Sequence, residues 1–340
     1  MKYSATAVQL ALTSSFVAGR GFDPARFVAN FGHTEAVLRR LAAETGSRLF
    51  LLPEFSFHGW AMGVPLADWN AAAVRLPGPE TERIGRLARE LDAYVAGTLF
   101  EAMPEFPGRH FLTGFVVAPD GELVLRYRKL YALSAKTRPG DVYQRWVELF
   151  GRESLFPVVE TPLGRLGMMI AWDAQFPEVA RALAMRGADV ILHPLGSAFA
   201  AGDEGSGFTH LREVRAHENV CYLVSANMGP LDSTGPQMQA RWPSQVIDPE
   251  GRVLAATTVD AEAHATATID LERLRAQRAM PVRNWLAQLQ PQLHAPDYAA
   301  ATLWPLSHWE SRPLADPREQ RELESGIAAR LAGSPALPSS

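Results

Sequence analysis

The chain has 340 residues, of which 47% are hydrophobic and 21% are charged. This length and composition suit one large globular domain and exclude a disordered or fibrous protein. The formal net charge is −4 and the sequence has no run of Lys or Arg, so we expect no nucleic-acid partner. The single cysteine, Cys221, cannot form an internal disulfide, so we expect packing alone to hold the fold and a reducing, cytoplasmic location.

The first half of the chain alternates short apolar runs with longer segments of helical period, which predicts helices packed over a sheet. The start of the chain makes a poor signal peptide because Gln9 interrupts its apolar stretch, and we predict a buried strand there. No apolar run reaches the roughly 20 residues of a membrane helix, so we expect no membrane partner. The predicted strands are 5–12, 48–52, 94–100, 111–118 and 123–129, and the predicted helices are 27–45 and 80–92.

The second half continues the same alternation. The predicted strands are 165–170, 189–194, 221–227, 244–247 and 253–258, and the predicted helices are 177–186 and 209–219. The glycine-rich segment 202–207 matches neither a P-loop nor a dinucleotide-binding motif, so we predict a loop near the mouth of a pocket. From residue 286 the chain is rich in Pro, Gln and Ala. We therefore assign 1–285 to one domain and 286–340 to an extension, which forms an arm on the surface or at a subunit interface.

Two charged residues stand where α/β folds often hold reactive groups. Glu54 follows directly after a predicted buried strand, which favours a general base, although a solvated residue capping the strand is the alternative. Lys129 ends a predicted strand between Tyr127 and Tyr131. Its ammonium could stabilise a developing negative charge, and an ordinary surface charge is the alternative.

The segment from Gly164 to Glu178 is an apolar strand that turns into a helix with Pro177 in its first turn. Such a turn presents one side chain above the sheet, beside backbone N–H groups that can bind an anion. Here that side chain belongs to Ala171, which has no nucleophilic atom. This position either packs inertly or has lost the group that once did the chemistry.

Together these segments resemble the nitrilase superfamily of carbon-nitrogen hydrolases. In order and spacing, residues 53–54, 128–129 and 167–178 are similar to the Glu, Lys and Cys motifs of that family. Further similar segments are 187–194, 215–219, 224–227 and 244–251, so the resemblance covers roughly residues 5 to 270. The resemblance implies an α/β fold with a four-layer α-β-β-α sandwich. It also implies a homodimer or higher homo-oligomer, with no metal and no cofactor.

The resemblance further implies a Cys-Glu-Lys site that opens an amide through a thioester intermediate. Glu54 then serves as the base, Lys129 with the backbone N–H of Trp172 stabilises the oxyanion, and Ala171 stands where the nucleophilic cysteine is expected. The family also tends to carry a second glutamate between the lysine and the cysteine, which we assign to Glu148 with Glu153 in reserve. The residues expected to contact the substrate are Trp172, Trp146, His193 and Asn227.

The residue two positions after Ala171 indicates the substrate class. Amidase and carbamoylase branches tend to have aspartate there, as at Asp173, whereas nitrilases tend to have glutamate. A small-molecule amide or N-carbamoyl compound is therefore favoured over a nitrile. Ala171 agrees best with an engineered inactive hydrolase that holds intact substrate; a natural silent binding protein is the alternative, and acyl transfer to an amine is a third possibility. Cys221 lies in an apolar run and is expected to be a core residue, not a substitute nucleophile.

Overall fold

The computed structural model describes residues 1–61, 63–132, 136–196, 198–200, 210–232, 238–240, 242–259, 261–301 and 303–333, with only the backbone given for 198–200 and 238–240. The glycine-rich segment 202–207, which the sequence predicts as a loop near a pocket, lies outside the described residues.

Two six-stranded sheets form the centre of the molecule. The first has the order β18-β1-β5-β6-β7-β8 and the second β17-β16-β13-β11-β10-β9. In each sheet parallel pairs at the centre are flanked by antiparallel pairs. The strands of the first sheet are β1 (Lys2–Gln9), β5 (Leu49–Leu51), β6 (Tyr94–Glu101), β7 (Phe111–Val117), β8 (Leu123–Arg128) and β18 (Ala263–Asp270). Those of the second are β9 (Val158–Thr161), β10 (Gly164–Met168), β11 (Val190–Leu195), β13 (Tyr222–Asn227), β16 (Gln245–Ile247) and β17 (Val253–Ala256).

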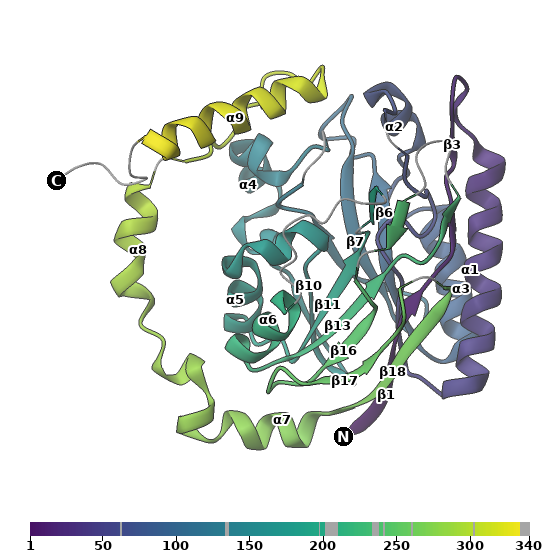
Figure 1. Cartoon of the computed structure of the whole chain (residues 1–340), viewed down its shortest axis with the longest axis vertical. Coiled ribbons are helices and arrows are strands. Elements are labelled where there is room, and N and C mark those ends of the chain that lie inside the picture. Colours follow the sequence, from purple (N-terminus) through teal and green to yellow (C-terminus); the bar gives the residue numbers. More distant parts are fainter. Residues whose placement is uncertain are drawn as a thin grey trace.

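Helices cover the outer face of each sheet. Figure 1 shows α1 (Pro24–Thr45) and α3 (Pro79–Leu91) on one side, and α5 (Pro177–Met185) and α6 (Leu211–Asn219) on the other. Apolar side chains of α1 and α3 pack with the first sheet, and those of α5 and α6 pack with the second. The predicted four-layer α-β-β-α sandwich is confirmed.

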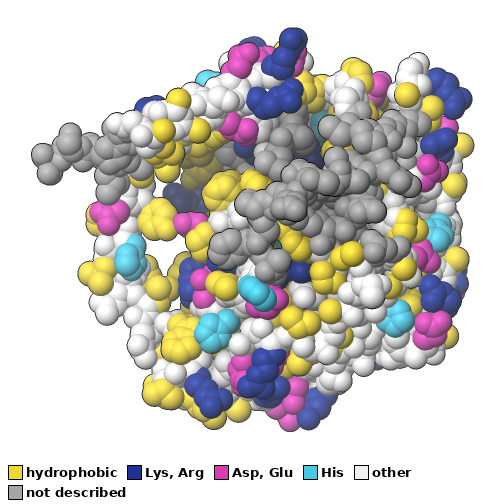
Figure 2. Space-filling model, viewed as in Figure 1, with side chains coloured by type: hydrophobic (Ala, Val, Ile, Leu, Met, Phe, Trp, Pro, Cys, Tyr) yellow, Lys and Arg dark blue, Asp and Glu magenta, His cyan; other side chains and the backbone are white. Residues whose placement is uncertain are grey.

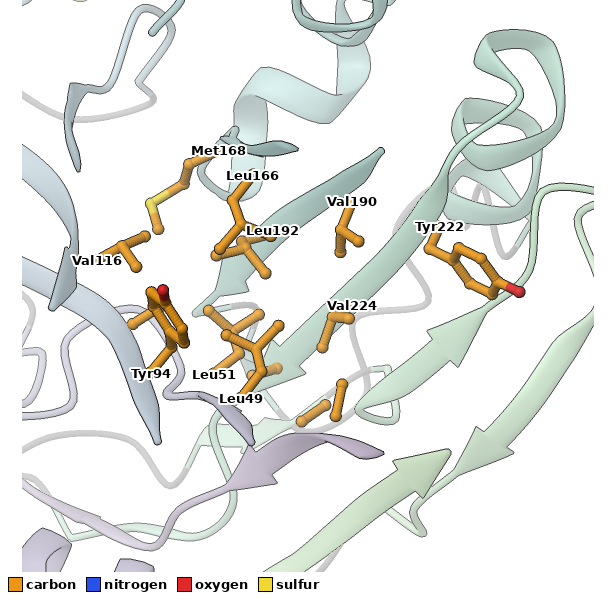
Figure 3. Close-up of a cluster of buried hydrophobic side chains, with 14 of the residues drawn as sticks. Leu49, Leu51, Tyr94, Val116, Leu166, Met168, Val190, Leu192, Tyr222 and Val224 are labelled. Atoms are coloured by element: carbon orange, nitrogen blue, oxygen red, sulfur yellow. The ribbon is translucent and has the colours of Figure 1, made fainter. Parts of the chain in front are cut away.

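The largest core lies between the two sheets. In Figure 3, Leu49 and Leu51 of β5 point toward Leu166 and Leu192 of the second sheet. The intervening Phe50 packs instead with α1 and α3, since successive strand side chains point to opposite faces. Both faces are therefore buried, which explains why these strands are continuous apolar runs and not alternating ones.

Gly114 on β7 lets the sheets approach closely at one point. A Cβ at this glycine would overlap the sulfur of Met168 and lie 3.2 Å from Cδ1 of Ile170. Both residues belong to the segment that leads from β10 into Ala171. Because Gly114 has no side chain, that segment can pack closely against the first sheet.

The remaining elements are short strands, short helices and a C-terminal arm. The short strands pair as β2 (Leu12–Thr13) with β14 (Leu231–Asp232), β3 (Phe16–Val17) with β4 (Gly21–Phe22), and β12 (Ala198–Ala200) with β15 (Met238–Ala240). The other helices of the main body are α2 (Leu66–Ala72) and α4 (Tyr143–Phe150), with 3-10 turns η1 (Pro139–Val142), η2 (Arg152–Leu155) and η3 (Ala171–Gln175). The sequence predicted neither α2 nor α4.

The arm leaves the body at α7 (Leu271–Arg278) and contains η4 (Pro281–Arg283), η5 (Trp285–Gln288), α8 (Pro291–Ala300) and α9 (Pro317–Gly333). Figure 1 shows α8 standing away from the body and α9 returning beside α4. Where the arm returns, Trp309 is buried and its carbonyl accepts a hydrogen bond from Arg109 at 2.5 Å. The sequence analysis predicted neither α8 nor α9. Among the described helices, none is both long and apolar enough to cross a membrane.

Candidate active site

A buried ion pair forms the centre of the candidate site. Lys129 Nζ donates to Glu54 Oε1 at 2.8 Å, and the two side chains are only 6% and 2% exposed. Glu54 follows β5 and Lys129 follows β8, so both come from one end of the first sheet. The backbone N–H of Glu54 also donates to the carbonyl of Leu195 at 3.3 Å, which ties this end to β11 of the second sheet.

Gly196, directly after β11, accommodates that close approach. A Cβ at this position would lie 2.9 Å from Oε2 of Glu54 and 2.8 Å from the ring of Phe55. Any larger residue would therefore push the carboxylate away from Lys129. Phe55 itself has a φ of 65°, a left-handed backbone that costs a non-glycine residue about 1–3 kcal/mol.

Ala171 occupies a second strained position, at the turn from β10 into η3. Its φ is 44° and its side chain is partly exposed. His193 of β11 holds this turn, because its Nε2 lies 3.1 Å from the carbonyl oxygen of Ala171 and its Nδ1 lies 3.0 Å from Oγ of Ser225. Burial lowers the pKa of His193 to about 3, so the ring is neutral. Its Nε2–H donates to the Ala171 carbonyl, and Nδ1 accepts from the serine hydroxyl.

Asp173 connects this turn to the segment that carries Lys129. Its carboxylate accepts from the hydroxyl of Tyr127 and from the backbone N–H groups of Tyr131 and Ile170, each at 2.8 Å. Tyr127 and Tyr131 stand on either side of Lys129 in the chain. Burial raises the pKa of Asp173 to about 6, and the charge of Lys129 opposes that rise. One carboxylate thus holds the lysine segment and the turn at Ala171 together.

Hydrogen bonds link the Lys129 segment to the same turn. Asp173 accepts from the backbone N–H of Tyr131, two residues after Lys129, and from that of Ile170, directly before Ala171. Glu54 is hydrogen-bonded to Lys129 and to the end of β11. The Lys129–Glu54 pair and the turn at Ala171 therefore lie at the same end of the two sheets.

The chain has clear relatives. A family model described as carbon-nitrogen hydrolase matches residues 5–279. The chain belongs to the carbon-nitrogen hydrolase family. The resemblance inferred from the sequence is thus confirmed at the level of the family, and the match ends before the helices of the C-terminal arm.

Relatives within the carbon-nitrogen hydrolase family include amidases. Omega-amidase NIT2 of Bos taurus is 29% identical over 238 residues, which are 70% of this chain and 82% of that protein. N-carbamoylputrescine amidase of Solanum tuberosum is 27% identical over 251 residues, 71% of this chain and 81% of that protein. A carbon-nitrogen hydrolase structure from Helicobacter pylori superposes with a TM-score of 0.69 at 21% identity, covering 88% of this chain and 99% of that one. This superposition shows the shared fold.

Two residues assigned to the site of this carbon-nitrogen hydrolase lie elsewhere. The side chain of Glu148 is 65% exposed on α4 and pairs with Arg145 at 3.3 Å, so it is a helix-surface charge. Trp146 is fully buried between Phe106 and Phe111, and its Nε1 donates to Ser154 at 2.9 Å. It is a core residue of a separate apolar cluster, not a wall of the site.

The other expected contact residues lie nearer the turn. Trp172 follows Ala171 directly and is 37% exposed, so its indole is accessible to a ligand. Asn227 is buried at the end of β13, where its Nδ2 donates to the carbonyl of Trp242 at 2.6 Å and its backbone N–H to Ser244 at 2.9 Å. Asn227 and His193 both hydrogen-bond to protein groups, which gives each a positioning role.

The sequence analysis missed Lys136. This lysine is 8% exposed, and its ammonium lies 4.9 Å from the centre of the Phe55 ring and 5.8 Å from that of Phe100. Burial, together with the charge of Lys129, lowers the pKa of Lys136 to about 7, and the charge of Glu54 opposes the shift. No spacing or motif marks this residue in the sequence, because its burial depends on how the chain after Lys129 folds back.

Among the described residues there is no group of three or more His, Cys, Asp and Glu side chains that could hold a metal ion. Cys221 is fully buried and burial raises its pKa to about 12, so it is not a nucleophile at neutral pH.

Proposed function

We propose that this chain binds a small amide or N-carbamoyl compound at Glu54, Lys129 and Ala171, and that Ala171 stands at the position of the nucleophile. The observation that carries the proposal is the buried Lys129–Glu54 pair, with the left-handed backbone turn at Ala171 linked to the lysine segment through Asp173. Strained non-glycine residues of this kind persist where surrounding structure holds them, often at reactive positions. The omega-amidase and N-carbamoylputrescine amidase relatives support the choice of substrate class.

The residue types fit hydrolysis through a thioester once position 171 carries a thiol. In an Ala171→Cys variant, Glu54 takes the thiol proton and the thiolate attacks the carbonyl carbon. Lys129 and the backbone N–H of Trp172, in the first turn of η3, stabilise the oxyanion. Glu54 returns the proton to the nitrogen as the C–N bond breaks. Water, deprotonated by Glu54, then opens the thioester and restores the thiol.

With alanine at 171, the same site binds its ligand without cleaving it. The methyl group offers no electron pair, so no acyl intermediate forms, while the carboxylate and ammonium groups that recognise the amide remain. An engineered replacement and a natural one give this chain the same chemistry. Sequencing codon 171 of the source gene distinguishes them.

The test of the function is the Ala171→Cys variant. We expect it to release ammonia or amine from members of a panel of amides and N-carbamoyl acids, while the parent chain releases none. The matched control is Ala171→Cys combined with Glu54→Gln, which keeps the thiol and removes the base. Two results together would overturn the proposal. The folded Ala171→Cys protein would have no activity on any compound of the panel, and the parent chain would bind none of them.

Two further outcomes of that test separate the alternatives. Binding by the parent without turnover by Ala171→Cys identifies a binding protein that recognises amide-like metabolites. Adding hydroxylamine to the active variant tests acyl transfer, because a hydroxamate product shows that an amine replaces water as acceptor.

We also propose that the chain forms a homodimer in which a second copy packs between the arm and the body. Figure 2 shows an opening between them, bordered by hydrophobic side chains. One described link between the arm and the body is the hydrogen bond from the Tyr298 hydroxyl to Glu178 of α5, at 2.7 Å. Exposed apolar side chains occur on the arm and on the facing helices α5 and α6, namely Met280, Val282, Trp285, Leu293, Leu303, Leu306, Met185 and Val214.

A two-fold axis would bring the arm of one copy against the helices of the other, where these side chains would be buried. Light scattering after size exclusion tests this arrangement. We expect a dimer from the parent chain and a monomer from a Val282→Asp, Leu293→Asp double variant. A parent that runs as a monomer at all concentrations contradicts the dimer.

A further inference from the structure

The C-terminal arm returns to the body at the part of the chain that follows Lys129. Gln320 of α9 is 2% exposed, and its Nε2 donates to the carbonyl of Ala132 at 3.1 Å. Ala132 comes shortly after Lys129, whereas Gln320 lies 188 residues farther along the chain than Ala132. A buried amide needs such a partner, so this contact fixes α9 to the backbone that leaves the Lys129–Glu54 pair.

Two tryptophans of the arm hold the turn η1. The backbone N–H of Trp309 donates to the carbonyl of Asp141 at 3.1 Å, and the carbonyl of Trp309 accepts from Arg109 at 2.5 Å. The guanidinium carbon of Arg138 lies 4.4 Å from the ring centre of Trp304, which is a cation–π contact. The Trp309 side chain is 4% exposed, so the burial of its indole supports these bonds. Figure 1 shows this end of the arm beside α4, which follows η1 directly.

The turn that the arm holds is continuous with residues next to the site. The ammonium of Lys136 lies 4.9 Å from the ring centre of Phe55, the residue after Glu54. The backbone N–H of Thr137 donates to the carbonyl of His110 at 3.0 Å, beside the start of β7. Contacts therefore run without interruption from the arm, through this turn, to the residues that follow β5.

We propose that the C-terminal arm positions the site, and that Gln320 and Trp309 act as its positioning residues. They hold Ala132 and the segment 136–142 against the body before a ligand arrives. A site arranged in advance does not lose the ordering of these residues on binding, so its affinity is higher. The match to the carbon-nitrogen hydrolase family ends at residue 279, so the arm lies outside the part of the chain that the family model describes. The effect on affinity rests on the proposed function, whereas the hold on the segment does not.

Hydrogen exchange on the full-length chain tests the hold on the segment without a ligand. Trp309→Ala removes the buried indole, and Gln320→Ala removes the hydrogen bond to Ala132. We expect the amides of 136–142 to exchange at least about fivefold faster in Trp309→Ala than in the parent, as for the loss of one hydrogen bond. In Gln320→Ala we expect the same change, about fivefold, for the amides of 130–132.

Two variants serve as controls. Trp309→Phe keeps an aromatic ring in the buried position, and Glu322→Ala changes an exposed residue of α9. Both should exchange as the parent does. Amides of β5 and β10 should exchange at the parent rate in every variant, which shows that the fold is intact.

Titration calorimetry then measures the effect on a ligand. The probes are butyramide and N-carbamoylglycine, one from each compound class of the proposed function. We expect Trp309→Ala and Gln320→Ala to weaken binding by about fivefold to tenfold, because binding must then also order the loosened residues. Trp309→Phe should keep the affinity of the parent, which a structural role of the indole alone would not predict.

The outcomes separate this inference from the proposed function. Unchanged exchange in both alanine variants overturns the inference and leaves the function untouched. Faster exchange with unchanged affinity also overturns it, because the arm then has a purely structural role. Faster exchange in β5 and β10 as well contradicts it, since the arm would then stabilise the whole fold. If the parent binds neither probe, the proposed function falls and the effect on affinity falls with it, while the exchange rates still decide whether the arm holds the segment.

Discussion

The hydroxyl of Tyr127 donates to the carboxylate of Asp173 at 2.8 Å, and this contact joins the end of β8 to the turn that carries Ala171. The same carboxylate accepts from the backbone N–H groups of Ile170 and Tyr131. Asp173 therefore determines where Lys129 stands relative to Ala171, although the proposed chemistry does not involve it directly. The sequence pattern singled it out only as an indication of substrate class.

We predict that Asp173→Ala destabilises the fold much more than Tyr127→Phe. The first change leaves two backbone N–H groups and a hydroxyl without their buried acceptor, at a cost of about 3 kcal/mol. The second removes one hydrogen bond and costs about 1 kcal/mol. Urea unfolding of the two variants and the parent measures the difference. Equal losses would show that the backbone contacts of Asp173 contribute little.

The ion pair at the centre of the site should show strong coupling in a double-mutant cycle. Lys129→Met leaves Glu54 buried without its partner, and Glu54→Gln does the same to Lys129, so each single change should cost about 3–5 kcal/mol. The double variant should cost clearly less than the sum. The exposed Arg145–Glu148 pair provides a matched control, with an expected coupling below about 1 kcal/mol. Similar coupling in the two cycles would contradict the burial of the central pair.

We expect opposite effects from adding a methyl group at two glycines. Gly114→Ala forces a Cβ into the sulfur of Met168, so it should destabilise the protein by about 1–3 kcal/mol and displace the turn at Ala171. Gly32→Ala lies within α1 with nothing within 4 Å of its new Cβ, and it should stabilise the protein by up to ~1 kcal/mol. Thermal unfolding of both variants tests this. A neutral Gly114→Ala variant would show that the two sheets are not in close contact there.

The sequence predicts the position of site residues that follow apolar strands. It does not predict whether a residue on a short helix faces the core or the solvent. Glu54, Lys129 and Ala171 each come within a few residues of the end of a strand, so their positions follow from the strand pattern. Glu148 fails because Trp146 lies on the same short helix and points into the core. Residues two apart on a helix point about 200° apart, so Glu148 faces solvent. Lys136 could not be predicted, because its burial arises from long-range packing against Phe55 and Phe100.

Three buried histidines should make the fold sensitive to acid. Burial lowers the pKa of His193 and His110 to about 3 and that of His58 to about 4. Below the unfolded-state pKa of about 6.5, the unfolded chain takes up protons that the folded chain excludes. Stability therefore falls as the pH decreases from about 6.5 toward these values. At pH 5, these three histidines should together take up about three protons when the protein unfolds.

The variant that checks the assignment is His193→Gln, which should reduce that uptake by about one proton. The exposed His294→Gln serves as the surface control. Urea unfolding between pH 5 and pH 7 measures the slope, and an unchanged slope in His193→Gln would show that His193 titrates normally in the folded protein.

Lys136 should also make stability rise with pH, across the neutral to alkaline range. Its folded-state pKa, about 7, lies below the ordinary lysine pKa of 10.5, because burial disfavours the ammonium. Between these values the unfolded chain holds a proton that the folded chain has released, so stability rises as the pH increases from 7. The gain in the free energy of unfolding is at most about 3 kcal/mol between pH 7 and pH 9, at ~1.4 kcal/mol per pH unit.

The Lys136→Met variant carries no charge to desolvate, so its stability advantage over the parent should be greatest below pH 7 and shrink toward pH 10. Urea unfolding of both proteins at pH 6 and pH 9 measures this, and an advantage that does not change with pH would show that Lys136 remains hydrated in the folded state.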